Sequence, residues 1–233
     1  MFKIIRQEWK KYLIDILVII IGISLSFLLD EWRQNLREKK VEIQALESIQ
    51  NNLITDTTLL ATRIKICDKF LWGYDQALTY ESEEFPEDSL AIYFDYMLSY
   101  IGFNATDIGY EELKQTGHSS LISNKVLLND IIRFYGNNVS LIKEWNDIDK
   151  QFILRDLIPY TMKKMPYTPP QGTFLFNNTA DILQLMKTDN ALKNHIKMNS
   201  AYKAVNKQVY ISVLARMKAL LTNITTEIEQ LKS

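Results

Sequence analysis

The sequence predicts an all-α protein: an N-terminal transmembrane helix that continues into a long helix, and a helical domain closed by a long C-terminal helix packed antiparallel to it. Three observations support this fold class: an apolar run near the start, long stretches almost free of glycine and proline at both ends, and apolar residues at helical spacing within them. The 233 residues suffice for one span and one folded unit. We therefore divide the chain into a basic tail (1–11), a transmembrane helix (12–29) and a membrane-external helical domain (30–233).

An apolar run from Tyr12 to Leu29, YLIDILVIIIGISLSFLL, is the predicted span. At about 1.5 Å per residue it is about 27 Å long, close to the roughly 30 Å hydrocarbon core of a bilayer. Trp9 and Tyr12 at one end and Trp32 at the other carry amphipathic rings, which favour the headgroup layer. We expect these three residues to anchor the helix at the two membrane interfaces.

A buried core helix and a cleavable signal peptide are the alternatives for this run. A core helix seldom has so long an apolar run with charges at both edges, and a signal peptide ends in small residues at a cleavage site. Here the run passes directly into Asp30-Glu31-Trp32-Arg33 with no such site. The sequence favours an uncleaved signal anchor.

The orientation follows from the basic residues beside the span. The two sides carry equal numbers: Lys3, Arg6, Lys10 and Lys11 before it, and Arg33, Arg37, Lys39 and Lys40 after it. Those before the span are denser, and basic residues favour the cytoplasmic side. We predict a bacterial inner-membrane protein with a cytoplasmic N-terminus and a periplasmic C-terminal domain.

Asp15 is the one costly residue in the span. A carboxylate at mid-bilayer costs at least about 2.5–3.5 kcal/mol, but near the interface it reaches water and headgroups. Asp15, Ile19, Gly22 and Ser26 share one helix face, and the small pair Gly22 and Ser26 allows another helix to approach closely. We expect a packing face, and the alternative is that Asp15 handles ions against a partner's span.

The stretch from Trp32 to about Tyr80 has no proline and only Gly73 as glycine, which predicts a long helix. A heptad frame starts inside the membrane and continues outward, so the span and this helix are expected to form one rod, with a break conceivable in the charged segment 33–40. Its first position takes Asp15, Gly22, Leu29, Leu36, Ile43, Gln50, Thr57, Ile64 and Leu71; its second takes Val18, Leu25, Trp32, Lys39, Leu46, Leu53, Leu60, Cys67 and Tyr74.

The C-terminal stretch from Ser200 to Lys232 has no glycine or proline and predicts a second long amphipathic helix. Two long helices at opposite ends of a domain can pair antiparallel, which favours packing within one chain over pairing of the first helix with its twin. The expected apolar positions are Tyr210, Leu214, Met217, Leu221, Ile224, Ile228 and Leu231.

Shorter helices are expected between these two, from turn, cap and breaker signals. The first is 89–101, with a strand as the alternative; the next are 108–116, capped by Asp107 and stopped by Gly117, and 124–135, capped by Ser123 and stopped by Gly136. A further helix begins at Asn138 or Ser140 and runs through Trp145, Ile148 and Phe152 to Pro159. Two more follow, from Thr179 or Asp181 to Met186 and at 189–198, and loops are expected at 82–88 and 165–178.

A signature around Tyr110 resembles a bacterial family of small, single-span, membrane-anchored proteins classed as a domain of unknown function. It comprises Tyr110-Glu111-Glu112-Leu113-Lys114-Gln115-Thr116-Gly117, then Leu121-Ile122-Ser123-Asn124, then Leu128, Ile131, Ile132 and Tyr135, and the span's Asp15, Gly22 and Trp32 are similar too. The resemblance implies a membrane anchor and brings no known activity, cofactor or catalytic residue. The signature reads physically as a helix, a left-handed cap at Gly117 and a second capped helix.

The composition argues against several kinds of function. A net charge of −1 and the lack of a basic block give no attraction to nucleic acid, and one cysteine and two histidines give no metal-ligand pattern. There is no phosphate-binding loop or catalytic motif, so no cofactor or small-molecule substrate is expected and an enzyme is unexpected. The weakest alternative is acid–base chemistry by Tyr110, Glu111, Glu112 and His118.

Two functional hypotheses follow from the sequence. The first is a non-enzymatic scaffold or interaction protein that is anchored in the bilayer and binds itself or another envelope protein. The second is an accessory subunit of an ion-driven membrane complex that uses Asp15.

Overall fold

The computed structural model describes residues 2–79, 87–165 and 179–233, and within these ranges the chain is all-α, as predicted. Its elements are α1 (Phe2–Thr79), α2 (Glu87–Leu98), α3 (Ile108–Gln115), the 3₁₀-helix η1 (His118–Leu121), α4 (Lys125–Arg133), the π-helix η2 (Phe134–Val139), α5 (Ser140–Phe152), the π-helix η3 (Ile153–Leu157), α6 (Ile158–Lys164), α7 (Thr179–Thr188) and α8 (Asn190–Lys232). The loops were predicted at 82–88 and 165–178. Residues 82–86 and 166–178 lie outside the described residues, and Glu87 and Asp88 belong to α2, so the first loop was predicted two residues too long.

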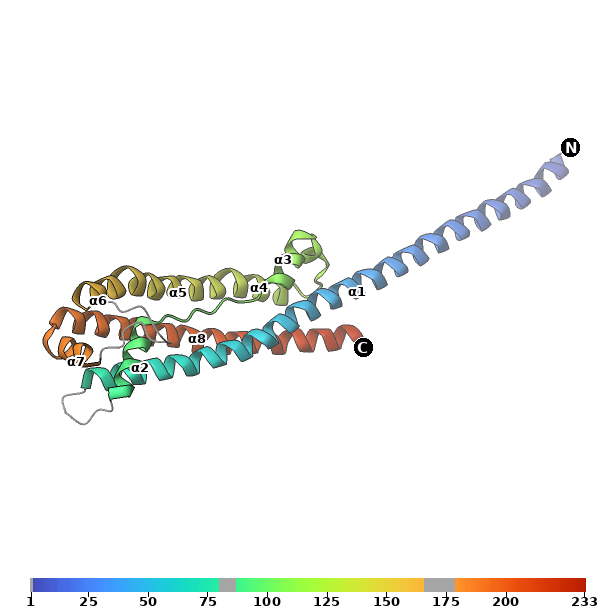
Figure 1. Cartoon of the computed structure of the whole chain (residues 1–233). Coiled ribbons are helices and arrows are strands. Elements are labelled where there is room, and N and C mark those ends of the chain that lie inside the picture. Colours follow the sequence, from blue (N-terminus) through green and yellow to red (C-terminus); the bar gives the residue numbers. More distant parts are fainter. Residues whose placement is uncertain (1, 80–86, 166–178) are drawn as a thin grey trace.

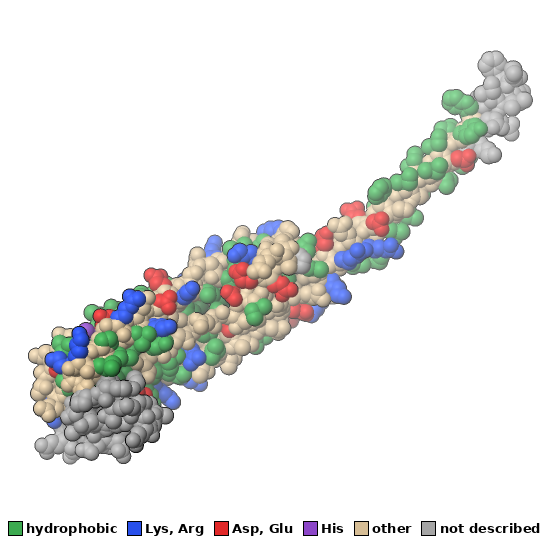
Figure 2. Space-filling model, turned by 45° about the horizontal axis from the view of Figure 1, so that its top comes forward, with side chains coloured by type: hydrophobic (Ala, Val, Ile, Leu, Met, Phe, Trp, Pro, Cys, Tyr) green, Lys and Arg blue, Asp and Glu red, His purple; other side chains and the backbone are tan. Residues whose placement is uncertain are grey.

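Three long helical stretches lie side by side: the C-terminal half of α1, the whole of α8, and the stretch from α4 to α6 (Figure 1). Helices α2 and α7 lie at the end of this bundle far from the N-terminus, and α3 lies at the near end. The N-terminal half of α1 projects from the bundle alone. Figure 2 shows apolar side chains along this projecting segment, which ordinary soluble helices avoid.

Helix α1 is one unbroken helix of 78 residues, so the predicted rod is confirmed and there is no break between residues 33 and 40. At about 1.5 Å per residue it is about 117 Å long. It contains the one stretch among the described residues that is long and apolar enough to cross a membrane, with a mean hydropathy of 2.6 over its most apolar window.

Helix α8 packs antiparallel to α1, as predicted. Lys232 Nζ lies 2.6 Å from Glu47 Oε1 and Lys207 Nζ lies 2.5 Å from Asp68 Oδ1, so the end of α8 meets the part of α1 nearest the span. The two helices expected at 189–198 and 200–232 are one helix of 43 residues. Its N-cap is Asp189, which accepts a hydrogen bond from the backbone N–H of Leu192; this bond, together with Tyr160 and Lys164, lowers the pKa of Asp189 to about 2.

The heptad frame on α1 is half right. The second row is buried as expected: Leu46, Leu53, Leu60, Cys67 and Tyr74. The first row is wrong by one residue: Ile43, Gln50, Thr57, Ile64 and Leu71 are only half-buried, whereas Glu42, Ile49, Asp56 and Phe70 are buried. The buried row contains two carboxylates, Glu42 and Asp56, so a search for apolar positions does not identify it.

The same one-residue error appears on α8. Tyr210, Met217, Ile224 and Ile228 are buried as predicted, but Leu214 and Leu221 are half-buried and Val213 and Leu220 take their places. The buried row keeps the alternating spacing of three and four residues but is offset by one residue from the predicted one. Leu214 is larger than Val213, and Leu221 and Leu220 are identical, so side-chain size and polarity do not identify the buried row.

In the middle of the chain, two helix ends predicted from the sequence, at Gly136 and at Pro159, are absent. Helical structure runs from Lys125 to Lys164 because π-helical turns at η2 and η3 carry the chain past Gly136 and Pro159. A π turn places the hydrogen bond one residue further along, which accommodates local irregularity without ending the helix. The cap of α4 is Asn124, whose side chain accepts from Leu127 N, and not Ser123.

The segment from 99 to 107, called the core segment below, crosses from α2 to α3 without regular structure. Side chains of the long helices bind its backbone: Asp56 accepts from Thr106 N (2.7 Å), Asn146 donates to Phe103 O (2.8 Å) and Tyr210 donates to Ile101 O (3.2 Å). Buried backbone groups need such partners. Glu42 acts similarly further along, accepting from the backbone N–H of Ser123 at 2.6 Å.

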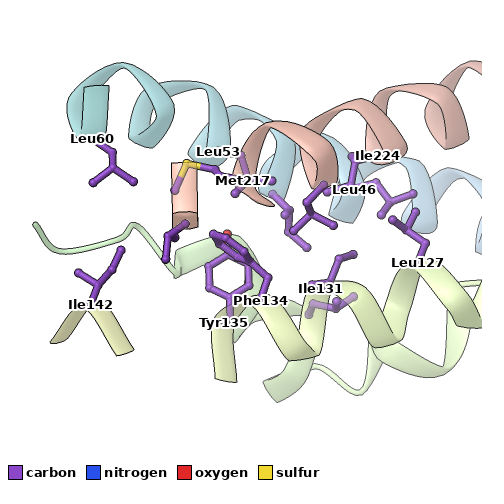
Figure 3. Packing of buried hydrophobic residues seen from close by; sticks show 14 of the residues in the cluster. Leu46, Leu53, Leu60, Leu127, Ile131, Phe134, Tyr135, Ile142, Met217 and Ile224 are labelled. Atoms are coloured by element: carbon purple, nitrogen blue, oxygen red, sulfur yellow. The ribbon is translucent and has the colours of Figure 1, made fainter. Parts of the chain in front are cut away.

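Two apolar clusters form the core. The larger lies nearer the span and joins α1 and α8 to α3, α4, η2 and α5; Figure 3 shows Leu46, Leu53, Ile131, Phe134 and Met217 converging in it. The smaller lies at the far end and joins α1, α2 and η3 to the start of α8, with Phe70, Phe94 and Ile196 among its members.

Candidate functional site

The span is exposed on all sides. Its large apolar side chains are between 46% and 70% exposed, and none of its most apolar stretch is buried inside the protein. The predicted interface anchors Trp9, Tyr12 and Trp32 are 67%, 59% and 59% exposed. These side chains are therefore free to meet lipid.

The predicted face of Asp15, Ile19, Gly22 and Ser26 is carried on an unbroken helix and is fully open. A Cβ on Gly22 would meet nothing within 4 Å, and Ser26 Oγ donates to Gly22 O at 2.9 Å, which satisfies the hydroxyl within the helix. No other part of the described chain packs on this face.

The family-like signature forms a corner that packs on α1 where the bundle begins. Tyr110 and Tyr135 stack with ring centroids 4.6 Å apart, and Leu113 and Ile122 are buried in the larger cluster with Leu121 half-buried beside them. Glu111 makes an exposed ion pair with Lys114. Gly117 takes the predicted left-handed conformation, with φ of 72°.

Sequence reasoning missed the closest approach at this corner, which is made by Gly109. A Cβ there would lie 2.8 Å from Ser48 Oγ and 3.0 Å from the backbone of Ile49. The first turn of α3 therefore touches the backbone of α1 directly. This close approach of two helices was not readable from one glycine in a short helix.

The suggested acid–base group includes His118, whose side chain lies outside the described part of the chain. Of the other members, Glu112 is exposed and lines a small hollow with Val41, Gln44 and Gly109, and the ring of Tyr110 stacks on that of Tyr135. In the described part of the chain no group of three His, Cys, Asp or Glu side chains lies close enough to hold a metal ion.

A buried ion pair between α5 and α8 is the polar feature that sequence reasoning missed. Lys203 Nζ lies 2.5 Å from Asp149 Oδ2, each side chain is 2% exposed, and the ammonium also lies 5.2 Å from the ring centroid of Phe70. Burial raises the pKa of Asp149 and lowers that of Lys203, and their mutual attraction works against both shifts. Taking both charges out of water makes the pair costly to break on one side only.

Asp56 and Glu42 bind backbone groups of connecting segments, whereas the hydrogen bond of this pair joins two side chains. Asp149 Oδ1 has no hydrogen-bond partner, and the same is true of the side-chain oxygens of Asn199 and Asn206, one helical turn to either side of Lys203. The available signal was the polar interruption of the α8 stripe at Asn199, Lys203 and Asn206, which favoured two separate helices. On α5 the expected apolar positions Trp145, Ile148 and Phe152 are half-buried, and Asp149 is buried between them.

Comparison with protein-family models, with curated proteins and with solved structures finds no match to this chain. The resemblance of the signature to a family of single-span proteins therefore stays a prediction.

Proposed function

We propose that this protein is a membrane-anchored, non-enzymatic scaffold whose helical domain binds a second copy or another envelope protein. One observation carries the proposal: the most apolar segment of the chain is a helix that is exposed on all sides and continuous with the core of the domain. Exposed apolar surface of this extent would aggregate in water, so lipid is its natural solvent.

The rigid connection supports a positioning role. From Leu29, the end of the apolar run, to Glu42, the first buried residue of the domain, α1 rises about 20 Å without interruption. A continuous helix holds the domain at this height and transmits its orientation to the span. A flexible linker would do neither.

The location proposed is the bacterial inner membrane, with the N-terminus in the cytoplasm and the domain in the periplasm. The dense basic residues before the span support this orientation. Protease added to spheroplasts is expected to digest the domain, and digestion only after lysis would reverse the orientation.

Carbonate extraction of membranes tests the anchor. The full-length chain is expected to stay in the pellet, and a variant lacking residues 12–29 is expected in the supernatant. Release of the intact chain by carbonate, or an N-terminus newly cut beyond residue 29, would overturn the proposal.

The competing hypothesis, an ion-coupled accessory subunit, makes Asp15 essential. As a scaffold, the chain should tolerate Asp15→Asn while losing assembly on Gly22→Leu, because the larger residue removes the close approach. Co-purification of partner chains from detergent-solubilised membranes reads out assembly. Intact assembly with lost function in Asp15→Asn would instead favour ion coupling.

A further inference from the structure

A hollow of about 380 Å³ opens between α8 and the junction of α4 with η2, and it is called the arginine hollow below. Two of its lining residues, Phe134 and Leu220, are apolar and buried. A volume of this size falls within the range of small-molecule sites, about 300–1,000 Å³. The charged and amide side chains that line it are Asp130, Arg133, Asn138, Arg216 and Asn223.

The π-helical turn η2 brings two of these polar residues together. In an α-helix Arg133 and Asn138 would point about 140° apart, because each residue turns the helix by about 100°. The hydrogen bonds of a π-helical turn join residues five apart, which brings such a pair to one side, and both residues line the hollow. The irregularity that carries the chain past Gly136 thus also shapes the hollow.

Asn138 is a buried polar residue whose side chain is left without a partner. It is 5% exposed, and its amide group makes no hydrogen bond with any other described residue. A buried amide that lacks a partner costs free energy. Since Asn138 lines the hollow, its amide N–H groups are available to donate to a ligand there.

The charges of the hollow favour an anion with a single negative charge. Arg133 comes from α4 and Arg216 from α8, and neither makes an ion pair with another described residue. Asp130 is the acidic residue of the lining, so the lining carries a net charge of +1. A carboxylate carries one negative charge and a phosphate nearly two. The planar guanidinium of arginine also matches the geometry of a carboxylate.

We propose that the arginine hollow binds a carboxylate group, with Arg133 and Arg216 as its ion-pair partners and Asn138 as a further hydrogen-bond donor. A short apolar part of the ligand packs against Phe134 and Leu220. A free organic acid and an acidic side chain of a partner protein offer the same chemistry. In the second case the hollow is a contact of the proposed scaffold.

The distance of the hollow from the membrane excludes a lipid headgroup as the ligand. Glu47 lies 18 residues beyond Leu29 and meets Lys232 at the end of α8. Arg216 lies 16 residues back along α8, away from the span. At about 1.5 Å per residue the hollow is about 50 Å along the rod from the apolar run. Headgroups extend only about 5–8 Å beyond the hydrocarbon core. This step rests on the proposed anchor.

Titration of the purified full-length chain in detergent, followed by ligand-observed NMR, tests the site with two matched pairs of ligands. Butyrate is paired with the uncharged butyramide, and the peptide acetyl-Ala-Glu-Ala-amide is paired with acetyl-Ala-Gln-Ala-amide. Saturable binding of a carboxylate is expected, with its amide bound at least tenfold more weakly. Saturable binding of neither carboxylate, or equal binding of a carboxylate and its amide, would overturn the proposal.

The two pairs also separate the two sources of the carboxylate. Tighter binding of the Glu peptide than of butyrate supports an acidic side chain of a partner protein. Binding of butyrate that is equal or tighter supports a free organic acid.

Substitutions locate the binding in the hollow. Arg133→Gln and Arg216→Gln should each weaken carboxylate binding at least tenfold, because each removes charge-assisted hydrogen bonds. Asp130→Asn should tighten binding several-fold, because it removes a negative charge beside the ligand. Arg155→Gln, an exposed arginine of η3 outside the hollow, is the control and should change nothing. Equal weakening by the control, or weaker binding in Asp130→Asn, would overturn the assignment.

Denaturant unfolding of each variant checks that the fold is kept. Arg133 and Arg216 are exposed, so their substitution should leave the free energy of unfolding nearly unchanged. Binding in detergent needs no membrane, so a negative result removes the site and leaves the proposed anchor standing. Carbonate extraction tests that anchor separately.

Discussion

Helix α1 passes through two environments along one continuous backbone. Between Glu42 and Tyr74 the domain packs along one side of it, and the buried row there includes two carboxylates, Glu42 and Asp56, that bind connecting segments. Between Tyr12 and Lys40 the apolar residues of the same helix are exposed, and no other described part of the chain covers them. The side of α1 that is buried in the domain thus carries both apolar and charged residues. The apolar run from 12 to 29 exposes apolar residues on all sides of the helix.

This difference shows that the hydrophobic pattern of the sequence identifies the exposed N-terminal half of α1 better than the buried row of its C-terminal half. The N-terminal region is recognised from its apolar surface alone, and the sequence shows that surface directly. In the domain a helix row is buried because of what packs on it, and a carboxylate at Asp56 or Glu42 is as buried as a leucine when a backbone N–H faces it.

Substitution of the buried pair should give the largest loss of stability within the domain. Lys203→Met leaves the Asp149 carboxylate buried without its counter-ion, which is expected to lower the free energy of unfolding by about 3–5 kcal/mol. Denaturant unfolding of the purified protein in detergent measures it. The double variant with Asp149→Leu should recover much of the loss, and a double variant as unstable as the single one would contradict a desolvated pair.

Two leucines on the same helix compare the two regions directly. Leu53→Ala empties a fully buried position and is expected to cost about 2–5 kcal/mol. Leu36→Ala, between the apolar run and the bundle, should change the free energy of unfolding by less than about 0.5 kcal/mol, because that side chain is 49% exposed. Similar losses from both would show that this part of α1 packs in the folded domain.

Substitution of Asp56 tests how much a buried carboxylate on α1 contributes to stability by binding the core segment. Asp56→Ala leaves Thr106 N–H without its acceptor, for an expected loss of about 1–3 kcal/mol in unfolding free energy. Thr62→Ala on the exposed side of α1 is the control, since its hydroxyl bonds only within the helix. A loss no larger than the control would remove the proposed role of Asp56 in holding the core segment.

The same residue gives a pH dependence with a defined sign. Burial raises the folded-state pKa of Asp56 above its ordinary value of 3.8. The folded state then keeps the proton over a range where the unfolded state has lost it, so stability falls as pH rises from 3.8 through the raised value. The free energy of unfolding should be measured for the unmodified protein and for Asp56→Asn over this pH range. The stability advantage of the unmodified protein over the variant should shrink as pH rises, and an advantage that grows with pH would contradict the burial argument.

Thiol reactivity should give the smallest effect, one of rate and not of stability. Cys67 is buried, so reagents do not reach it, and burial raises the pKa of its thiol to about 11, so little of it is thiolate near pH 8. A thiol introduced as Gln34→Cys should be alkylated rapidly in the same molecule while Cys67 reacts only after denaturation. Comparable native-state rates would show that the domain opens around Cys67.

Much of the architecture was predictable because it depends on local signals. The exposed apolar helix of spanning length, the unbroken long helix, the antiparallel C-terminal helix and the left-handed Gly117 follow from length, periodicity and glycine chemistry. The errors have non-local causes: π-helical turns carry the chain past Gly136 and Pro159, and buried carboxylates satisfied by distant backbone groups shift the apparent rows. The Asp149–Lys203 pair joins residues far apart in the sequence, and neither is recognisable alone.

The central claim is that α1 is one helix whose solvent changes from lipid to water to protein, and site-directed spin labelling tests it most directly. A nitroxide moved one residue at a time from 13 to 41, in the full-length protein in bilayers, reports collisions with dissolved oxygen and with a water-soluble nickel complex. Oxygen collisions should dominate from 13 to 29 on every side of the helix, and nickel collisions should dominate on the exposed sides beyond residue 33. Dominant nickel collisions throughout 13–29 would contradict the account.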